Sequence, residues 1–135
     1  MADPRIPSVF PRPFRGLVQP LGTSARGMSV QQRFLETIAG NLANAHTTRT
    51  PEGGPYRRQV AVDEGGEVRT VEDPRPGRQS YDPGHPDADA NGFVTEPNVN
   101  VESELVDLMV VRRLFEANAS VFQAAKTMLR RALEI

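Results

Sequence analysis

The last stretch of the chain, Val101 to Ile135, reads VESELVDLMVVRRLFEANASVFQAAKTMLRRALEI and contains neither proline nor glycine. Its apolar residues recur at spacings of three, four or seven, which places them on one stripe of an α-helix. They are Val101, Leu105, Leu108, Phe115, Ala119, Phe122, Leu129 and Leu133. Arg112 and Lys126 fall on the same stripe. At 1.5 Å per residue the pattern predicts a helix of roughly 50 Å, whose apolar stripe needs partners.

The composition restricts the class of protein. The 135 residues carry a net charge of -1 and 24% charged residues, so no basic surface of the kind that binds nucleic acid is expected. The apolar content of 38% is low for a globular domain, and the 12 prolines and 11 glycines lie mostly before residue 100. There is no cysteine, which excludes disulfides and thiolate ligands. No apolar run approaches the roughly 18 residues of a membrane span, and no cleaved signal peptide is expected.

Residues 1–20 form the first of four segments and are rich in proline. Proline disfavours helix and favours extended chain, so a flexible tail is expected here. Its prolines are Pro4, Pro7, Pro11, Pro13 and Pro20.

Residues 21–45 carry a second helical pattern, weaker than the C-terminal one. Leu21, Met28, Leu35 and Leu42 share one face. Glycines inside this segment each cost about 1 kcal/mol relative to alanine in an exposed helix. The helix is therefore expected to depend on packing against the C-terminal helix.

The middle of the chain, residues 46–100, is predicted to be irregular with a little β structure. Tyr56–Val62 and Val68–Val71 alternate weakly around a glycine turn and predict a small hairpin. Asp73–Asn100 contains five prolines and three glycines, so regular secondary structure is not expected there. Asn98 or Asn100 is expected to cap the following helix.

These segments predict a mainly α fold, in which the helices at residues 21–45 and 101–135 pair as an antiparallel coiled-coil-like hairpin. The predicted seam consists of Leu21, Met28, Leu35 and Leu42 against Leu105, Leu108, Phe115, Phe122 and Leu129. Because the first helix is the shorter one, part of the longer stripe would remain for other molecules. Arg112 and Lys126 then become candidates for contacts between subunits.

No motif in the chain predicts catalysis or a cofactor. Asp87 to Gly92 matches the first half of a calcium loop, but Asn98 stands where the bidentate Glu should be. Asp82 and His85 belong to a string of proline and Asx turns rather than to a zinc site, which usually takes four Cys or His ligands. No nucleophile elbow, phosphate loop or dinucleotide fingerprint is present. We therefore expect no enzyme, no metal and no cofactor.

At the end of the first helix the residues resemble a known family. Asn41-Leu42-Ala43-Asn44-Ala45, followed by Thr47-Thr48, is similar to the N-terminal signature of bacterial flagellar rod and hook proteins. Thr48 to Arg58 narrows the resemblance to the FlgC family of proximal-rod proteins. Further blocks at 72–74, 81–88, 92–94 and 97–101, and in the C-terminal helix, extend it over residues 21–135. The motif residues are Asn41, Asn44, Thr47, Asp82, Gly84, His85, Pro86, Asn98, Asn100, Glu116 and Asn118.

The resemblance implies a structural subunit of the flagellar basal body without enzymatic activity. Members of such a family are exported by the flagellar type III apparatus without a cleaved signal. They pack their terminal helices with copies of themselves and other rod subunits into the periplasm-spanning rod, with no nucleic acid and no direct membrane insertion. Asn41 and Asn44 would satisfy backbone groups where the first helix ends.

Two other classes of function remain open at the level of sequence. A cytosolic helical adaptor or export-chaperone-like protein would also carry two amphipathic helices that bind partner helices. Such a protein should be a stable helical oligomer on its own, whereas a rod subunit should have labile ends before assembly. A calcium-binding extracellular module is the third reading, and a calcium titration tests it.

Overall fold

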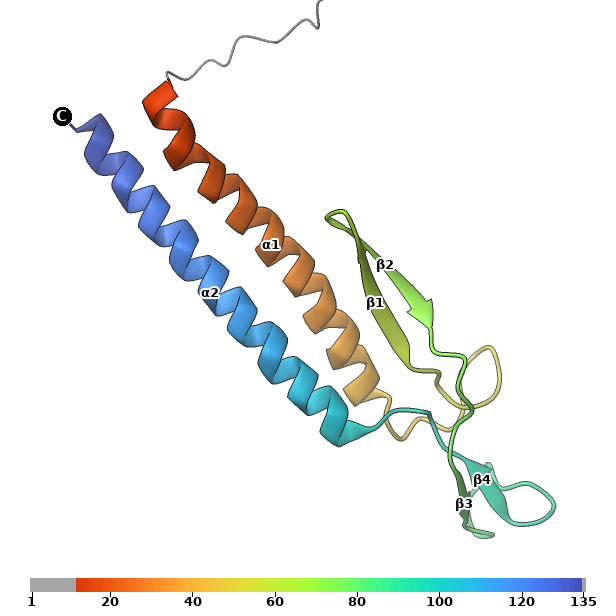
Figure 1. The fold of residues 1–135 in the computed structure, drawn as a ribbon. Helices are drawn as coiled ribbons and strands as arrows, with labels where there is room; N and C mark the ends of the chain where they lie inside the picture. The colour runs from red at the N-terminus through yellow and green to blue at the C-terminus, as the bar shows by residue number, and fades with distance from the viewer. Residues whose placement is uncertain (1–11, 135) are drawn as a thin grey trace, which may run out of the picture.

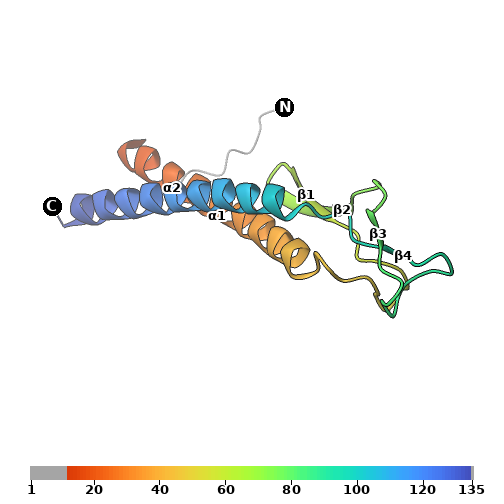
Figure 2. The ribbon, with the colours of Figure 1, turned by 90° about the horizontal axis from the view of Figure 1, so that it is seen from below.

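The computed structural model describes the backbone of residues 12–134 and the side chains of residues 15–134. Two helices dominate it, α1 (Arg12–Ala43) and α2 (Val101–Leu133), and they run side by side in opposite directions (Figure 1). They cross at a small angle when seen from below (Figure 2). A mainly α fold with a paired helical hairpin is thus confirmed.

Helix α1 begins at Arg12, nine residues before the predicted start at Leu21. The prediction of a flexible tail over residues 1–20 is therefore wrong for residues 12–20, and residues 1–11 lie outside the described part. Pro13 lies in the first turn, where its missing N–H removes no helical hydrogen bond. Pro20 lies inside the helix, at a cost of about 3 kcal/mol in an isolated helix. Packing against α2 offsets this cost, so helix propensity alone could not predict that the helix continues through Pro20.

Helix α2 begins at Val101, as predicted, and ends at Leu133. Of the two proposed capping residues, Asn100 is the N-cap: its side-chain oxygen accepts a hydrogen bond of 2.8 Å from the N–H of Ser103. Acidic residues in the first turn and Arg130 and Arg131 in the last turn complement the helix dipole.

The two helices have almost the same length, 32 residues in α1 and 33 in α2. The expectation that a short first helix leaves part of the α2 stripe overhanging is therefore wrong. Any surface that α2 offers to other molecules must lie on a different side of the helix.

The predicted hairpin is present as β1 (Gln59–Glu64) and β2 (Glu67–Glu72), which pair antiparallel with Val60 opposite Val71. Gly65 and Gly66 form the two-residue turn with φ of 72° and 97°, which suits glycine and a type I′ turn. The hairpin packs along α1 (Figure 1).

A second, smaller hairpin contradicts the prediction of no regular structure between Asp73 and Asn100. It consists of β3 (Gln79–Tyr81) and β4 (Phe93–Thr95), which extend beyond the end of the helix pair (Figure 1). Hydrogen bonds from Asp82 N to Gly92 O and from Glu96 N to Arg78 O continue the pairing on either side. Strands of three residues are too short to give a periodic sequence signal.

Candidate assembly interface

The seam between α1 and α2 is centred one residue away from the predicted stripe. On α1 the buried positions are Ser24, Ile38 and Asn41, while Leu21, Met28, Leu35 and Leu42 are half-buried beside them. On α2 the buried positions are Glu104 and Ala125, while Leu108, Phe115, Phe122 and Leu129 are half-buried. The seam therefore alternates between large apolar side chains and small or polar ones.

Four residues of the predicted α2 stripe lie outside this seam, one of them Leu133, which is 70% exposed. Leu105 is 45% exposed, because Glu104 takes the buried position. Arg112 and Lys126 are exposed, and their neighbours Val111 and Ala125 face α1 instead.

Two contacts fix the register of the helix pair. Asn41 of α1 donates to the carboxylate of Glu104 at 3.1 Å. Gly27 of α1 lies against Asn118, whose Nδ2 would be 2.8 Å from a Cβ at position 27. The two contacts lie fourteen residues apart on each helix, which is two heptads.

Asn41 is the centre of a polar junction where α1, α2 and β1 meet, and it is 1% exposed. Its amide pairs with Gln59 of β1 as a backbone neighbour would, donating to the carbonyl and accepting from the N–H, both at 2.8 Å. The hydroxyl of Tyr56 donates to the same Asn41 oxygen at 2.9 Å. Burial, and secondly the negative charge of Glu104, raise the pKa of Tyr56. The Asn41 side chain thus joins three elements with every donor and acceptor used.

Arg58 supplies the positive charge of the polar junction. Its Nε–H donates to Glu104, which is completely buried, and its guanidinium also lies 3.5 Å from the carboxylate of Asp73. Asp73 in turn pairs with Arg75, whose side-chain hydrogen bonds hold the pKa of Asp73 well below its ordinary value. A buried carboxylate without such a partner would be costly, so Arg58 and Glu104 depend on each other.

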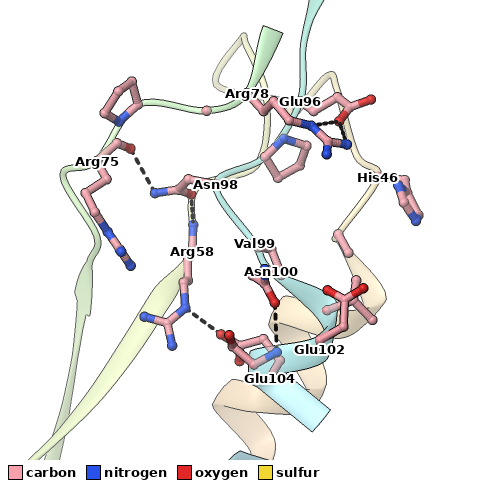
Figure 3. Close-up of a pocket in the computed structure, with 16 residues that line it drawn as sticks. His46, Arg58, Arg75, Arg78, Glu96, Asn98, Val99, Asn100, Glu102 and Glu104 are labelled. Atoms are coloured by element: carbon pink, nitrogen blue, oxygen red, sulfur yellow. Dashed lines mark hydrogen bonds and ion pairs between the residues drawn. The ribbon is translucent and has the colours of Figure 1, made fainter. Parts of the chain in front are cut away.

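Asn98 closes the polar junction from the side of the β4–α2 connection (Figure 3). Its side-chain oxygen accepts from the backbone N–H of Arg58 at 2.7 Å, and its amide donates to the carbonyls of Arg75 and Asp73 at 2.9 and 3.2 Å. Asn98 therefore stabilises the connection that leads into α2, while Asn100 caps the helix itself.

A cleft of about 580 Å³ lies beside the polar junction, between the start of α2 and the base of the β3–β4 hairpin (Figure 3). Most of its charged side chains are already engaged: Arg78 pairs with Glu96, and Arg58 points toward Glu104. No described residue aims an unpartnered buried polar group into the cleft. The cleft therefore offers no arrangement for chemistry.

The β3–β4 loop is fastened to the segment after α1 by Asp87. The hydroxyl of Thr48 donates to its carboxylate at 2.7 Å, and Arg49 forms an ion pair with it. The Thr48 hydrogen bond, followed by the Arg49 charge, lowers the pKa of Asp87. His85 accepts from the backbone N–H of Asp87 through Nδ1 at 3.0 Å.

The other motif residues of this region form local turns. Asp82 accepts from the N–H of Gly84, and Pro86 lies exposed in the same loop. Asn44 donates to the carbonyl of Gly40 and accepts from Thr47, which ends α1.

The carboxylates of the acidic loop are engaged by groups of the chain itself. Asp87 is occupied by Thr48 and Arg49, and Asp89 accepts from the backbone N–H groups of Asn91 and Phe93. Within residues 12–134 no group of three His, Cys, Asp or Glu side chains is placed to hold a metal ion.

Helix α2 carries a second apolar surface that faces away from the seam. We call it the outer face of α2 and define it as Val106, Val110, Leu114, Val121 and Met128. These side chains are 49–59% exposed, with Leu114 at 51% and Met128 at 52%. Glu116 pairs with Arg112 at 3.0 Å, and both side chains are more than half exposed. Among the described residues no helix is long and apolar enough to cross a membrane.

Sequence reasoning missed the pairing of Arg58, Asp73 and Glu104, and it missed the outer face of α2. The first had a signal, because Glu104 continues the alternation of three and four residues that runs through Leu108, Val111 and Phe115. The outer face of α2 had a sequence signal as well, because Val110, Leu114, Val121 and Met128 recur at steps of four and seven residues. Each of them stands one position before a residue of the seam.

Comparison with known proteins gives matches at both ends of the chain. A family described as "Flagella basal body rod protein" matches residues 21–49, and one described as "Flagellar basal body rod FlgEFG protein C-terminal" matches residues 90–135. These segments contain the end of α1 and all of α2, including both partners of the Asn41–Glu104 contact.

Whole-chain relatives agree with these matches. The flagellar basal-body rod protein FlgC of Borreliella burgdorferi is 34% identical, over 89% of this chain and 97% of its own. The FlgC proteins of Salmonella typhimurium and Bacillus subtilis are 36% and 34% identical, over 80% and 85% of this chain and 89% and 95% of theirs. The chain belongs to the FlgC family of flagellar basal-body rod proteins.

Proposed function

We propose that this protein is a structural subunit of the flagellar basal-body rod and that it assembles through its helices. The observation that carries the proposal, beyond family membership, is the outer face of α2. Five large apolar side chains on one side of a helix remain about half exposed or more while the seam is already occupied by α1. A chain that has satisfied its internal seam and still presents this surface requires another protein to cover it.

The polar junction gives the subunit a defined shape for this role. Arg58 and Asn41 tie the first hairpin and both helices together at one end, and Asp87 fastens the second hairpin to the segment after α1. Ion pairs and hydrogen bonds of this kind set the orientation of elements rather than supplying most of the stability. They suit a subunit that transmits mechanical load.

Localisation and partners follow from the same proposal. The rod is expected to cross the periplasm as the drive shaft between motor and hook, with other rod subunits as neighbours. The flagellar type III export apparatus is the expected route, without a cleaved signal. The alternative, a cytosolic helical adaptor, is not favoured, because the relatives over most of the chain are named rod proteins.

Deletion of the gene with complementation tests the proposal. Cells without the protein should be non-motile and should contain truncated basal bodies by electron microscopy, and the wild-type chain should restore both. Swimming by the deletion strain would contradict a role in the rod.

A further inference from the structure

We propose that the β3–β4 hairpin binds the proline-rich residues 4–7, Pro-Arg-Ile-Pro, of a second copy of this chain, with Tyr81 and Phe93 as the binding surface. The inference rests on the proposed function in one respect, because a rod provides the neighbouring copy. The hairpin extends beyond the end of the helix pair (Figure 1), so this contact involves neither the seam nor the outer face of α2.

The exposed face of the β3–β4 hairpin carries two aromatic rings. Tyr81 and Phe93 are cross-strand partners, and their rings meet edge to face with 5.3 Å between the ring centroids. The two residues are 66% and 40% exposed, whereas Val94 between the strands' buried positions is 3% exposed. Exposed aromatic rings whose orientation is fixed by each other are typical of surfaces that bind protein segments.

Gly92 brings Pro83 close to the Tyr81 ring. A Cβ at position 92 would lie 3.0 Å from Cε2 of Tyr81 and 3.1 Å from Cβ of Pro83. Gly92 also has a φ of 82°, a conformation that favours glycine. Because glycine leaves this space open, Tyr81, Pro83 and Phe93 form one surface, which we call the aromatic platform.

The aromatic platform has the chemistry that recognises proline-rich segments. Aromatic surfaces bind PxxP sequences, because the extended polyproline II conformation is favoured by proline before binding and loses little entropy. Residues 4–7 have this pattern. Pro83 and Pro86 repeat the spacing, but their backbone is folded into turns by the hydrogen bonds from His85 N to Asp82 O and from Ala88 N to His85 O.

Charges beside the aromatic platform complement the same segment. Asp82 directly follows Tyr81, and Asp89 accepts a hydrogen bond of 2.9 Å from the N–H of Phe93. Both carboxylates belong to exposed residues, and within residues 15–134 neither has a cationic partner. Arg5 lies inside the Pro-Arg-Ile-Pro sequence, and its guanidinium is suited to pair with a carboxylate.

Residues 4–7 are too close to α1 to reach the platform of their own chain. Helix α1 has 32 residues and is therefore about 48 Å long. The β3–β4 hairpin lies beyond the far end of this helix (Figure 1). Pro4 stands eight residues before Arg12, and eight residues of polyproline II span about 25 Å. The segment that occupies the platform must therefore come from another copy.

Titration of a synthetic peptide of residues 1–11 into the full chain tests this contact in solution. In ¹⁵N-correlated NMR spectra the amide signals of Tyr81 and Phe93 should shift and saturate. A peptide with both Pro4→Ala and Pro7→Ala should bind about fivefold more weakly, which corresponds to about 1 kcal/mol. A peptide with Arg5→Glu should also bind more weakly, and the difference should shrink as salt is added. Neither change touches the folded chain.

Variants of the chain locate the site. Tyr81→Ala should weaken binding of the native peptide about fivefold, or by about 1 kcal/mol. Leu133→Ala removes another exposed apolar side chain, at the opposite end of the molecule, and is the matched control. Its affinity for the peptide should equal that of the native chain.

The outcomes against the contact are distinct. Saturating shifts on the outer face of α2 instead of at Tyr81 and Phe93 would overturn the inference, as would the absence of saturable shifts at millimolar peptide. Equal binding of the native and the Pro4→Ala, Pro7→Ala peptides would overturn it as well.

Dilution of the full chain without added peptide tests the origin of the segment. The Tyr81 signal should move with protein concentration, because the bound segment comes from a second copy. A bound position that does not change on dilution would show a contact within one chain and would overturn the inference. Motility of the deletion strain tests the rod function separately, since the peptide titration does not depend on it.

Discussion

Glu104 carries a negative charge at a position that no solvent reaches, and Arg58 is its only cationic partner within the described residues. The side chains of the pair are 1% and 20% exposed. The pair illustrates how a charged residue can belong to a helix seam: its oxygens accept from Arg58 and Asn41, and both donors come from outside α2.

Arg58→Leu should therefore destabilise the fold strongly. It leaves the Glu104 carboxylate buried with Asn41 as its remaining donor, and removing one partner of a buried pair costs about 3–5 kcal/mol. Urea unfolding of the purified chain, followed by circular dichroism, measures the loss. Arg69→Leu is the control, because Arg69 and Glu64 form a pair that is more than half exposed and should cost less than about 1 kcal/mol. Equal losses for the two variants would contradict the role of the junction.

The lowered pKa of Asp87 predicts that the stability of the fold decreases in acid. Thr48, followed by Arg49, holds its pKa below the ordinary 3.8 in the folded chain. A lowered folded-state pKa means that the stabilisation is complete above pH 3.8 and is lost as the pH falls through the lower value. Asp87→Asn cannot titrate, so its unfolding midpoint should fall less between pH 5 and pH 3 than that of the native chain. An identical fall in both proteins would show that Asp87 does not contribute.

At the scale of elements, the two helices and the first hairpin could be predicted from periodicity and turn chemistry. The start of α1 could not, because Pro20 argues locally against a helix that tertiary packing nevertheless stabilises. The β3–β4 hairpin could not either, since its strands are held by loop contacts such as Thr48 to Asp87 rather than by a pattern of their own.

The positions of apolar residues alone could not predict which side of α2 forms the seam. The sequence offers α2 two neighbouring apolar rows, and choosing between them requires knowledge of Glu104 and Asn118, which are polar. Both face α1, where Glu104 accepts a hydrogen bond from Asn41 and Asn118 packs against Gly27. Polar residues within a seam set its register at some cost in stability.

Gly27 and Asn118 should therefore show coupled effects on the stability of the helix pair. A Cβ at position 27 would lie 2.8 Å from Asn118 Nδ2, which offsets the helix-propensity gain of about 1 kcal/mol expected for Gly27→Ala. Combining it with Asn118→Ala removes the clash, so a double-mutant cycle should give a favourable coupling of about 1 kcal/mol.

Gly16→Ala provides the control for this cycle, because nothing lies within 4 Å of the added methyl group. It should stabilise the chain by about 0.5–1 kcal/mol and should not couple to Asn118→Ala. Additive effects of Gly27→Ala and Asn118→Ala would refute the close approach of the helices.

At the scale of the whole molecule, the need for partners has a different origin from the one suggested by the sequence. Overhang of a long helix was expected to leave apolar surface, but α1 matches α2 in length. The surface that remains is a second side of α2. The two helices of the subunit pair with each other, and one side of α2 still remains exposed. This is expected of a protein that buries further apolar area during assembly.

The most direct test of this account is a charge on the outer face of α2. Leu114 is 51% exposed, so Leu114→Asp should leave the helix content and the unfolding midpoint of the isolated chain nearly unchanged. In cells the same variant should abolish swimming and rod formation, because assembly would bury the new charge. Gln123→Asp, which changes an exposed residue on another side of α2, should swim normally. A stable Leu114→Asp chain that assembles rods and supports swimming would contradict the central claim.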